Sequence, residues 1–300
     1  MKRIATLTAA LVGVALALSL IASTTARGPA QPARSPLVAA VHGRVHVDGR
    51  DLIVEILVAV PDGADADAAA HAALHRAYPE ALPLTDGAQA TGYTTNGLVW
   101  TDPPPPVVVN YNAAGSPLAG AKTDLLAAMT SWSTVATSSF SYVYGADTTR
   151  CPSLVKECPG GQTLDGNHDV GWADIADSSV LGVTWYSTSA DEFDIILDNA
   201  NFVWAAACTG NYSLQTVYLH ELGHAVGLGH SEVTTAVMYA YYSGPRCALA
   251  QPDIDGVSAL YPAAGGGAPT PTPALSASPT PVPTATPANC PPGKARRGRC

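Results

Sequence analysis

Hydrophobic and polar positions alternate in two short runs near the start of the chain and then give way to a helical pattern. Residues 43–60, GRVHVDGRDLIVEILVAV, hold two strand-like runs on either side of Asp48-Gly49, a dipeptide typical of hairpin turns. The alanine-rich residues 65–82 have the composition of a helix. We therefore expect a small N-terminal module over residues 27–95, followed by a boundary rich in glycine and proline.

The pattern further along predicts a larger domain over residues 96–262. Apolar residues recur at steps of three and four positions within residues 118–135, which predicts an amphipathic helix. A second helix is expected to begin at the N-cap Ser213 and to end at Gly227 or Gly229. A third is expected over residues 252–262. Strands are expected at residues 107–112, 140–145, 169–175, 181–187 and 193–199.

The two ends of the chain have compositions unlike a folded domain. Lys2 and Arg3 precede an apolar run and then small residues around Thr24 to Ala26, so residues 1–26 resemble a secretory signal peptide. An uncleaved membrane anchor is the alternative, and the small residues favour cleavage. Residues 263–300 are rich in proline and threonine and end in a basic tip. We interpret them as a linker and a solvated tail that could touch an anionic or cell-envelope surface.

Charge and cysteine content narrow the class of protein. The net charge is -9, and only 13% of residues are charged, so nothing predicts nucleic-acid binding. The six cysteines all lie beyond the leader, which fits disulfides in an oxidising compartment and a secreted or cell-surface protein. Order along the chain suggests the pairs Cys151–Cys158, Cys208–Cys247 and Cys290–Cys300, although sequence does not choose among the alternatives.

Residues 220–230, HELGHAVGLGH, carry the spacing of a metal site. His220 and His224 stand four residues apart, on one face of the predicted helix. Gly227 can adopt positive φ, end the helix and direct His230 toward the same point. Three neutral imidazoles leave one tetrahedral zinc position open to water, and Glu221 is placed to accept that water's proton as general base. The pattern predicts metal-assisted peptide hydrolysis with one catalytic zinc.

The chain contains an internal comparison for this motif. His71 and His75 in HAALH have the same spacing but lack the acid, the glycine turn and the third histidine, so we interpret them as the polar face of a helix. A core helix with stray histidines would not need the full set at residues 220–230. The rival function is a cell-surface binding or structural module braced by zinc, and Glu221 favours the enzyme because such a module has no use for an acid there.

The motif HExxHxxGxxH resembles the metzincin clan of zinc endopeptidases, and the downstream sequence resembles the matrixins, the matrix-metalloprotease type. Met238 in AVMYAYY resembles the methionine of their Met-turn, and PDIDGVSALYP resembles their closing helix. The resemblance covers about residues 98–262. It implies an α+β catalytic domain with a twisted mixed sheet, a long active-site helix, a Met-turn beneath the metal and a C-terminal helix. It also implies protein or peptide substrates and, with no sign of assembly, a monomer.

Further roles follow from the resemblance alone. FDIILDN, residues 193–199, would be the edge strand that holds an extended peptide, and residues 239–245 would form the wall of the main specificity pocket. Tyr242 is a candidate for supporting the transition state.

Departures from the matrixin pattern limit what the resemblance implies. The histidine-rich loop of a second zinc is reduced to His168, so that zinc is not expected. Calcium is left open, with oxygen ligands available from Asp165, Asp169, Asp174 and Asp177 and solvated loop acids as the favoured interpretation. Matrixin propeptides block the metal with a cysteine, but no cysteine lies between Arg27 and Arg150, so that switch cannot operate from this N-terminal module. The N-terminal module is either a propeptide of another kind or an assisting domain.

Overall fold

The structure is a computed structural model that describes most of the chain between its two ends. The described residues are 35–47, 49–85, 92–101, 105–152, 164–187, 189 and 192–264. The expected leader (1–26), the pairs Cys151–Cys158 and Cys290–Cys300, and all but the start of the tail (263–300) therefore lie outside the described residues. Within the part that is described, no helix is long and apolar enough to cross a membrane.

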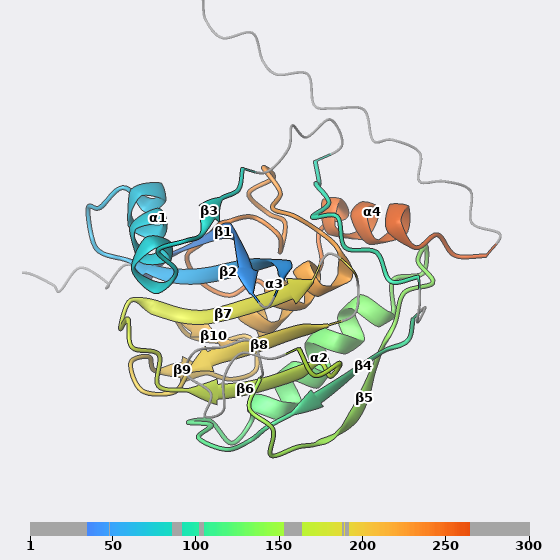
Figure 1. The fold of residues 1–300 in the computed structure, drawn as a ribbon. Helices are drawn as coiled ribbons and strands as arrows, with labels where there is room; N and C mark the ends of the chain where they lie inside the picture. The colour runs from blue at the N-terminus through green and yellow to red at the C-terminus, as the bar shows by residue number, and fades with distance from the viewer. Residues whose placement is uncertain are drawn as a thin grey trace, which may run out of the picture. The chain divides into compact units, whose positions relative to one another are not determined.

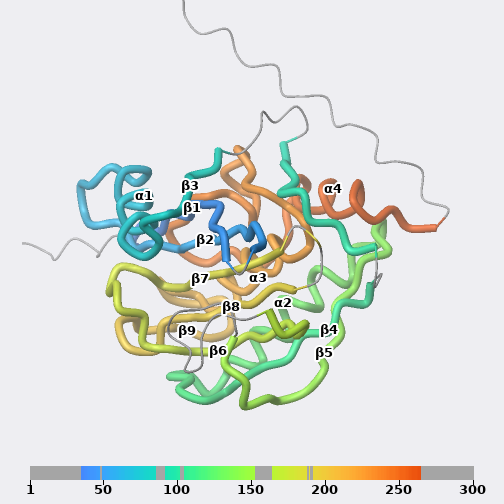
Figure 2. Tube along the Cα trace, viewed as in Figure 1, coloured from blue at the N-terminus to red at the C-terminus, as the bar shows by residue number. Residues whose placement is uncertain are grey.

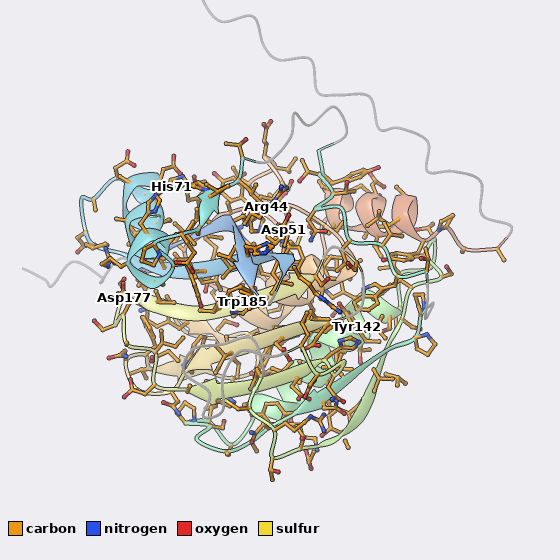
Figure 3. The ribbon with its side chains drawn as sticks, in the orientation of Figure 1. Arg44, Asp51, His71, Tyr142, Asp177 and Trp185 are labelled. Carbon is orange, nitrogen blue, oxygen red and sulfur yellow. A yellow bond between two sulfur atoms is a disulfide. The ribbon has the colours of Figure 1, made fainter. Side chains whose placement is uncertain are left out.

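The N-terminal hairpin and helix have the form that the sequence predicts. Strands β1 (Leu37–Val47) and β2 (Arg50–Val60) are antiparallel, and Val47 faces Arg50 across a two-residue turn in which Gly49 has φ +80°. Helix α1 (Ala66–Ala77) begins at Asp65, whose side chain accepts a hydrogen bond from the backbone N–H of Ala68. Figure 3 shows His71 on α1, far across the view from Tyr142.

One mixed sheet joins this hairpin to the larger domain. Its order is β11-β1-β2-β7-β8-β6-β4-β5, with β3 (Leu82–Pro83) paired to β1. The strands β5, β4, β6 and β8 form a parallel part of the sheet, in that order. Strand β7 is antiparallel to both of its neighbours, β8 and β2. The bounds are β4 (Val107–Tyr111), β5 (Tyr142–Asp147), β6 (Asp169–Ala173), β7 (Val180–Ser187), β8 (Phe193–Asp198) and β11 (Tyr241–Tyr242). A separate parallel pair is formed by β9 (Trp204–Ala205) and β10 (Tyr212–Ser213).

Helices cover both faces of the sheet. In Figure 1, α2 (Ala121–Ser133) and α3 (Leu214–Val226) lie behind strands β4 to β8, and their side chains share one core with that face. α1 packs on the other face, against β1, β2 and β7. β2 divides its side chains between the two cores, with Ile53 and Leu57 toward α3 and with Leu52, Val54, Ile56 and Val58 toward α1. The α+β class with a mixed sheet is confirmed.

The position of the expected edge strand was predicted wrongly. FDIILDN forms β8, but β8 lies inside the sheet, between β6 and β7. β7 is the antiparallel strand at that border of the larger domain, and β2 pairs with its outer side from Leu52 to Val58. Alternation along a strand shows which residues face a core but not which strand comes last, so the sequence could not decide between the two.

Every residue of α3 except Gln215 is buried, so its C-terminal carbonyl groups must find partners within the protein. Gly227 ends the helix with φ +117°, and its N–H and that of Leu228 bond the carbonyl groups of His224 and Gly223. The indole of Trp100 donates to Ala225 O at 2.7 Å and the hydroxyl of Tyr261 to Val226 O at 2.8 Å. Each of the last four carbonyl groups of α3 is therefore satisfied.

The remaining helix holds the exit of α3 in place. α4 (Gln251–Leu260) carries Gly256, and a Cβ there would come within 2.7 Å of Leu228. The segment from Gly92 to Trp100 passes beside α4, as the trace in Figure 2 shows, with Tyr93 against Gly256. This segment and α4 together enclose the end of the helix that carries the histidines.

We predict that Gly227→Ala destabilises the fold by more than the strained backbone alone would. An alanine Cβ at Gly227 would lie 2.2 Å from the carbonyl oxygen of Leu98, so the backbone has to move. Gly244 has φ +102° with nothing within 4 Å, so Gly244→Ala isolates the cost of the left-handed conformation, about 1–2 kcal/mol. In urea denaturation, Gly227→Ala should lose about 3 kcal/mol or more. Equal losses for the two variants would contradict the close packing at Gly227.

Candidate functional site

The structure brings the three predicted histidines together. His220 and His224 project from α3, and their Nε2 atoms lie 3.1 Å apart. His230 follows the turn at Gly227, and its ring centroid lies 5.4 Å from that of His220 and 5.1 Å from that of His224. All three side chains are buried. Gly227 therefore performs the turn that the sequence suggested for it.

The Nδ1 atoms of His220 and His224 are occupied by backbone carbonyl groups. His220 Nδ1 donates to Val237 O and His224 Nδ1 to Leu228 O, both at 2.8 Å. This arrangement fixes the tautomer and leaves each Nε2 lone pair directed into the site, as metal-binding histidines require. Burial lowers the pKa of His224 to about 3, so its imidazole is neutral.

The loop that carries His230 is held by the segment before β4. The hydroxyl of Thr94 donates to His230 O at 2.8 Å, and Gly229 N–H donates to Thr94 O. Asn96 donates to the carbonyl groups of His224 and Leu228. The residues from Gly92 onward therefore help to position the third histidine.

Met238 lies directly beneath the helix that carries the first two histidines. A Cβ at Gly223 would come within 2.2 Å of the Met238 sulfur and 2.9 Å of the Trp132 ring, so only glycine permits this approach. Asp253 on α4 accepts hydrogen bonds from the N–H groups of Val237 and Met238 at 2.9 and 3.1 Å. The PDIDG sequence thus fixes the turn that contains the methionine.

Glu221 is the predicted general base, and its environment is unusual. The side chain is 1% exposed, and neither carboxylate oxygen has a hydrogen-bond partner among the described residues. Burial raises the pKa of Glu221 well above its usual value, and the negative charge of Glu55 raises it further. A buried carboxylate without partners points to a ligand or water at this position.

Tyr242 is also buried, and its hydroxyl has no partner among the described side chains and backbone groups. Burial raises the pKa of Tyr242, and the charge of Glu221 contributes to the rise, so the two groups lie close enough to interact. Tyr242 belongs to β11, within the segment expected to form the specificity wall.

Two functional candidates were not found from the sequence, and both come from the N-terminal hairpin. Glu55 on β2 is fully buried, and its carboxylate lies 2.5 Å from His224 Nε2, 3.0 Å from His220 Nε2 and 3.5 Å from His230 Nε2. His42, opposite Glu55 on β1, bonds the same carboxylate and stacks on His230 with ring centroids 4.2 Å apart. A single glutamate inside the apolar run LIVEILVAV was the signal that could have identified this position.

The acids considered for calcium are partly engaged elsewhere. Arg150 binds both oxygens of Asp169, and Arg76 pairs with Asp177 on the neighbouring loop, near α1 in Figure 3. Within the described residues, the one cluster of three or more metal-binding side chains is His42, Glu55, His224 and His230. His168 stacks on Phe193. The predicted disulfide Cys208–Cys247 is confirmed, and it ties the segment after Tyr242 to the loop before β10.

A family model described as Matrixin matches residues 108–262, slightly more than half of the chain. The chain belongs to the matrixin family. The match covers β4 to α4 and therefore includes the three histidines, Glu221 and Met238, so the predicted resemblance is confirmed.

Curated relatives of this matrixin are similar over shorter stretches. A probable matrix metalloproteinase of Invertebrate iridescent virus 3 is 36% identical over 103 residues, which is 33% of this chain and 28% of that protein. Human matrix metalloproteinase-26 is 34% identical over 97 residues, 31% of this chain and 36% of that one. The chain thus spans about a third of these relatives. Among solved structures, metalloproteinase-II from Bacteroides fragilis aligns over 78% of this chain and 81% of that one, with a TM-score of 0.33 and 14% identity.

We predict that Asp253→Asn destabilises this matrixin strongly, because an amide presents its own donors to backbone N–H groups that need an acceptor. The expected loss is about 3 kcal/mol in urea denaturation of the metal-loaded protein. Asp255, two residues along the same helix, bonds only the side chain of Gln251 at the surface, so Asp255→Asn should change stability by less than about 0.5 kcal/mol. Indistinguishable denaturation midpoints for the two variants would contradict the anchoring role of Asp253.

Proposed function

We propose that this matrixin is a secreted zinc-dependent endopeptidase in which His220, His224 and His230 hold the metal and Glu221 is the general base. The observation that carries the proposal is the convergence of the histidine Nε2 atoms beside the buried Glu221 carboxylate, which has no partner in the part of the chain that the structure describes. A module that used zinc only as a brace would have no need to bury Glu221 unpaired, because that burial is costly.

The donor set fits zinc. Nitrogen ligands about 2.0–2.1 Å from a tetrahedral zinc lie about 3.3 Å from one another. The Nε2 atoms of His220 and His224 are 3.1 Å apart, and their Nδ1 hydrogens are bound to carbonyl oxygens. These two rings need almost no movement to bind the ion.

The proposed site assigns a separate role in peptide hydrolysis to the histidines, to Glu221 and to Tyr242. Zinc bound to the three histidines would acidify a water and polarise the carbonyl of the scissile peptide. The Glu221 carboxylate takes a proton from the attacking water and delivers it to the nitrogen of the leaving amine, so that the C–N bond breaks without a free amide anion. We assign to the Tyr242 hydroxyl, which has no partner among the described residues, a hydrogen bond to the oxygen on which charge develops.

The substrate is a protein or peptide segment in extended form. The outer side of β7 and the segment around β11 flank the proposed metal site, and both are paired with the N-terminal hairpin in this structure. When freed, such backbone edges bind an extended peptide by main-chain hydrogen bonds. Side chains at residues 239–245 would then set the bond preference. Met238 supports the site from below and takes no part in the reaction.

Secretion is supported by the leader-like residues 1–26 and by the disulfide Cys208–Cys247, which is typical of oxidising compartments. We propose that the basic tail contacts an anionic surface. We also propose that the enzyme is a monomer. Calcium is left out, because two of the four acids considered are held by arginines.

Glu221→Gln should keep zinc and lose about three orders of magnitude or more in turnover, because the amide cannot accept the proton. Hydrolysis of a quenched fluorescent peptide is measured on the full-length chain before and after limited trypsin treatment, with the trypsin then inhibited. The measurement after trypsin treatment detects activity even if the chain becomes active only when it is cleaved. Turnover by Glu221→Gln equal to that of the parent would exclude this mechanism.

Zinc content provides an independent test of the ligands. His224→Ala should lower bound zinc, measured by plasma emission spectrometry, to well below one ion per chain. His71→Ala removes a histidine of the same i, i+4 spacing on α1 and should leave zinc unchanged. Equal zinc in the two variants would remove the ligand assignment.

A further inference from the structure

The N-terminal hairpin pairs with both backbone edges to which the proposed function assigns the substrate. β2 pairs with the outer edge of β7 from Leu52 to Val58, and β1 pairs with β11 at Val38 and Ala39. Ala40 N–H adds a bond of 2.8 Å to Ala240 O. The hairpin therefore bridges the two edges that flank the metal site and satisfies the backbone groups that a substrate would use.

Glu55 occupies the centre of this bridge. Its partners across the sheet are His42 on β1 and Thr184 on β7, and its carboxylate reaches all three Nε2 atoms at 2.5–3.5 Å. These separations bracket the distance of about 3.3 Å between two ligands of one tetrahedral zinc. The carboxylate thus stands where a fourth ligand would stand.

The Glu55 carboxylate is fully buried, which favours a positive charge beside it. Glu55 is 0% exposed, and an isolated carboxylate in such surroundings is strongly disfavoured. A divalent ion between the three imidazoles and Glu55 would supply the compensating positive charge.

His42 holds the carboxylate in this position. It bonds Glu55 Oε2, and its ring stacks on that of His230 at an interplanar angle of 3°. Oε1 is left facing His220 and His230. His42 is therefore a positioning residue for Glu55.

We propose that Glu55 is the fourth ligand of the zinc held by His220, His224 and His230, and that residues 37–60 fill the substrate groove, so the full chain is latent until this hairpin leaves. The proposal rests on the endopeptidase function above and extends it to regulation. The catalytic water and Glu55 compete for one coordination position.

The hairpin also contains a matched control. His46 and Asp51 form the same kind of cross-strand pair, with the side chains 3.0 Å apart, but they are 66% and 61% exposed. Figure 3 shows Asp51 near the hairpin end that also carries Arg44. Asp51→Asn therefore makes the same chemical change in the same strand, away from the metal.

The test measures access to the metal in full-length protein loaded with Co²⁺, using azide as the probe ligand and visible absorption as the readout. The parent and Asp51→Asn should show little spectral change with azide, whereas Glu55→Gln should bind it, with an apparent affinity at least about tenfold higher. Parent protein that binds azide as readily as Glu55→Gln would overturn the proposal.

Parent protein treated with trypsin provides a second measurement that needs no variant. Loss of the hairpin should open the Co²⁺ site to azide and raise peptide hydrolysis at least about tenfold over the untreated chain. N-terminal sequencing should place the start of the active product at or before Gly92, since Thr94 and Asn96 hold the His230 loop. An untreated parent as active as the treated one would refute latency alone, whereas inactivity in every form would refute the endopeptidase function.

Discussion

The burial of α3 is the constraint on which the rest of the structure depends. A helix that lies wholly in the core cannot leave its final carbonyl groups to water, so other parts of the chain must supply donors. Trp100, Tyr261 and Asn96 do so from the segment before β4 and from the end of α4. The same contacts fix the direction in which the chain leaves Gly227, and hence where His230 lies. The contacts that stabilise the end of α3 therefore also set the geometry of the proposed metal site.

Close approach beneath the helix depends on small residues. Gly223 lets Met238 and Trp132 contact the backbone of α3, and the Trp132 indole donates to Leu219 O at 3.0 Å. The Asp253 carboxylate then accepts hydrogen bonds from the consecutive N–H groups of Val237 and Met238. Val237 O in turn fixes the ring of His220. A chain of contacts therefore runs from Asp253 on α4 through the methionine turn to His220, one of the proposed metal ligands.

The sequence predicted what local spacing determines and failed where strands from distant parts of the chain meet. Ser213, Gly227 and the two histidines of α3 follow from helix geometry, and the structure places them as expected. The order of β7 and β8 did not follow, because every residue of both strands is buried and neither burial pattern marks an edge. Part of the environment of Glu55 could have been predicted from the sequence. The turn at Gly49 sets Val47 opposite Arg50, and continuing this register along both strands pairs His42 with Glu55. The register predicts an acid beside a histidine, but it does not predict that β2 pairs with β7 next to the three histidines of the site.

A ligand carried on a hairpin of the same chain also explains how blockage could be strong and still reversible. While the hairpin is tethered, the local concentration of Glu55 at the metal is high, and no free peptide competes easily with it. Ile53 and Leu57 add burial on the same face, in the core shared with α3. Cutting the tether leaves these contacts unchanged but makes release a bimolecular equilibrium that dilution and further proteolysis favour. A carboxylate suits this role because it binds zinc without needing a reduced thiol, and disulfides such as Cys208–Cys247 are typical of compartments where thiols are oxidised.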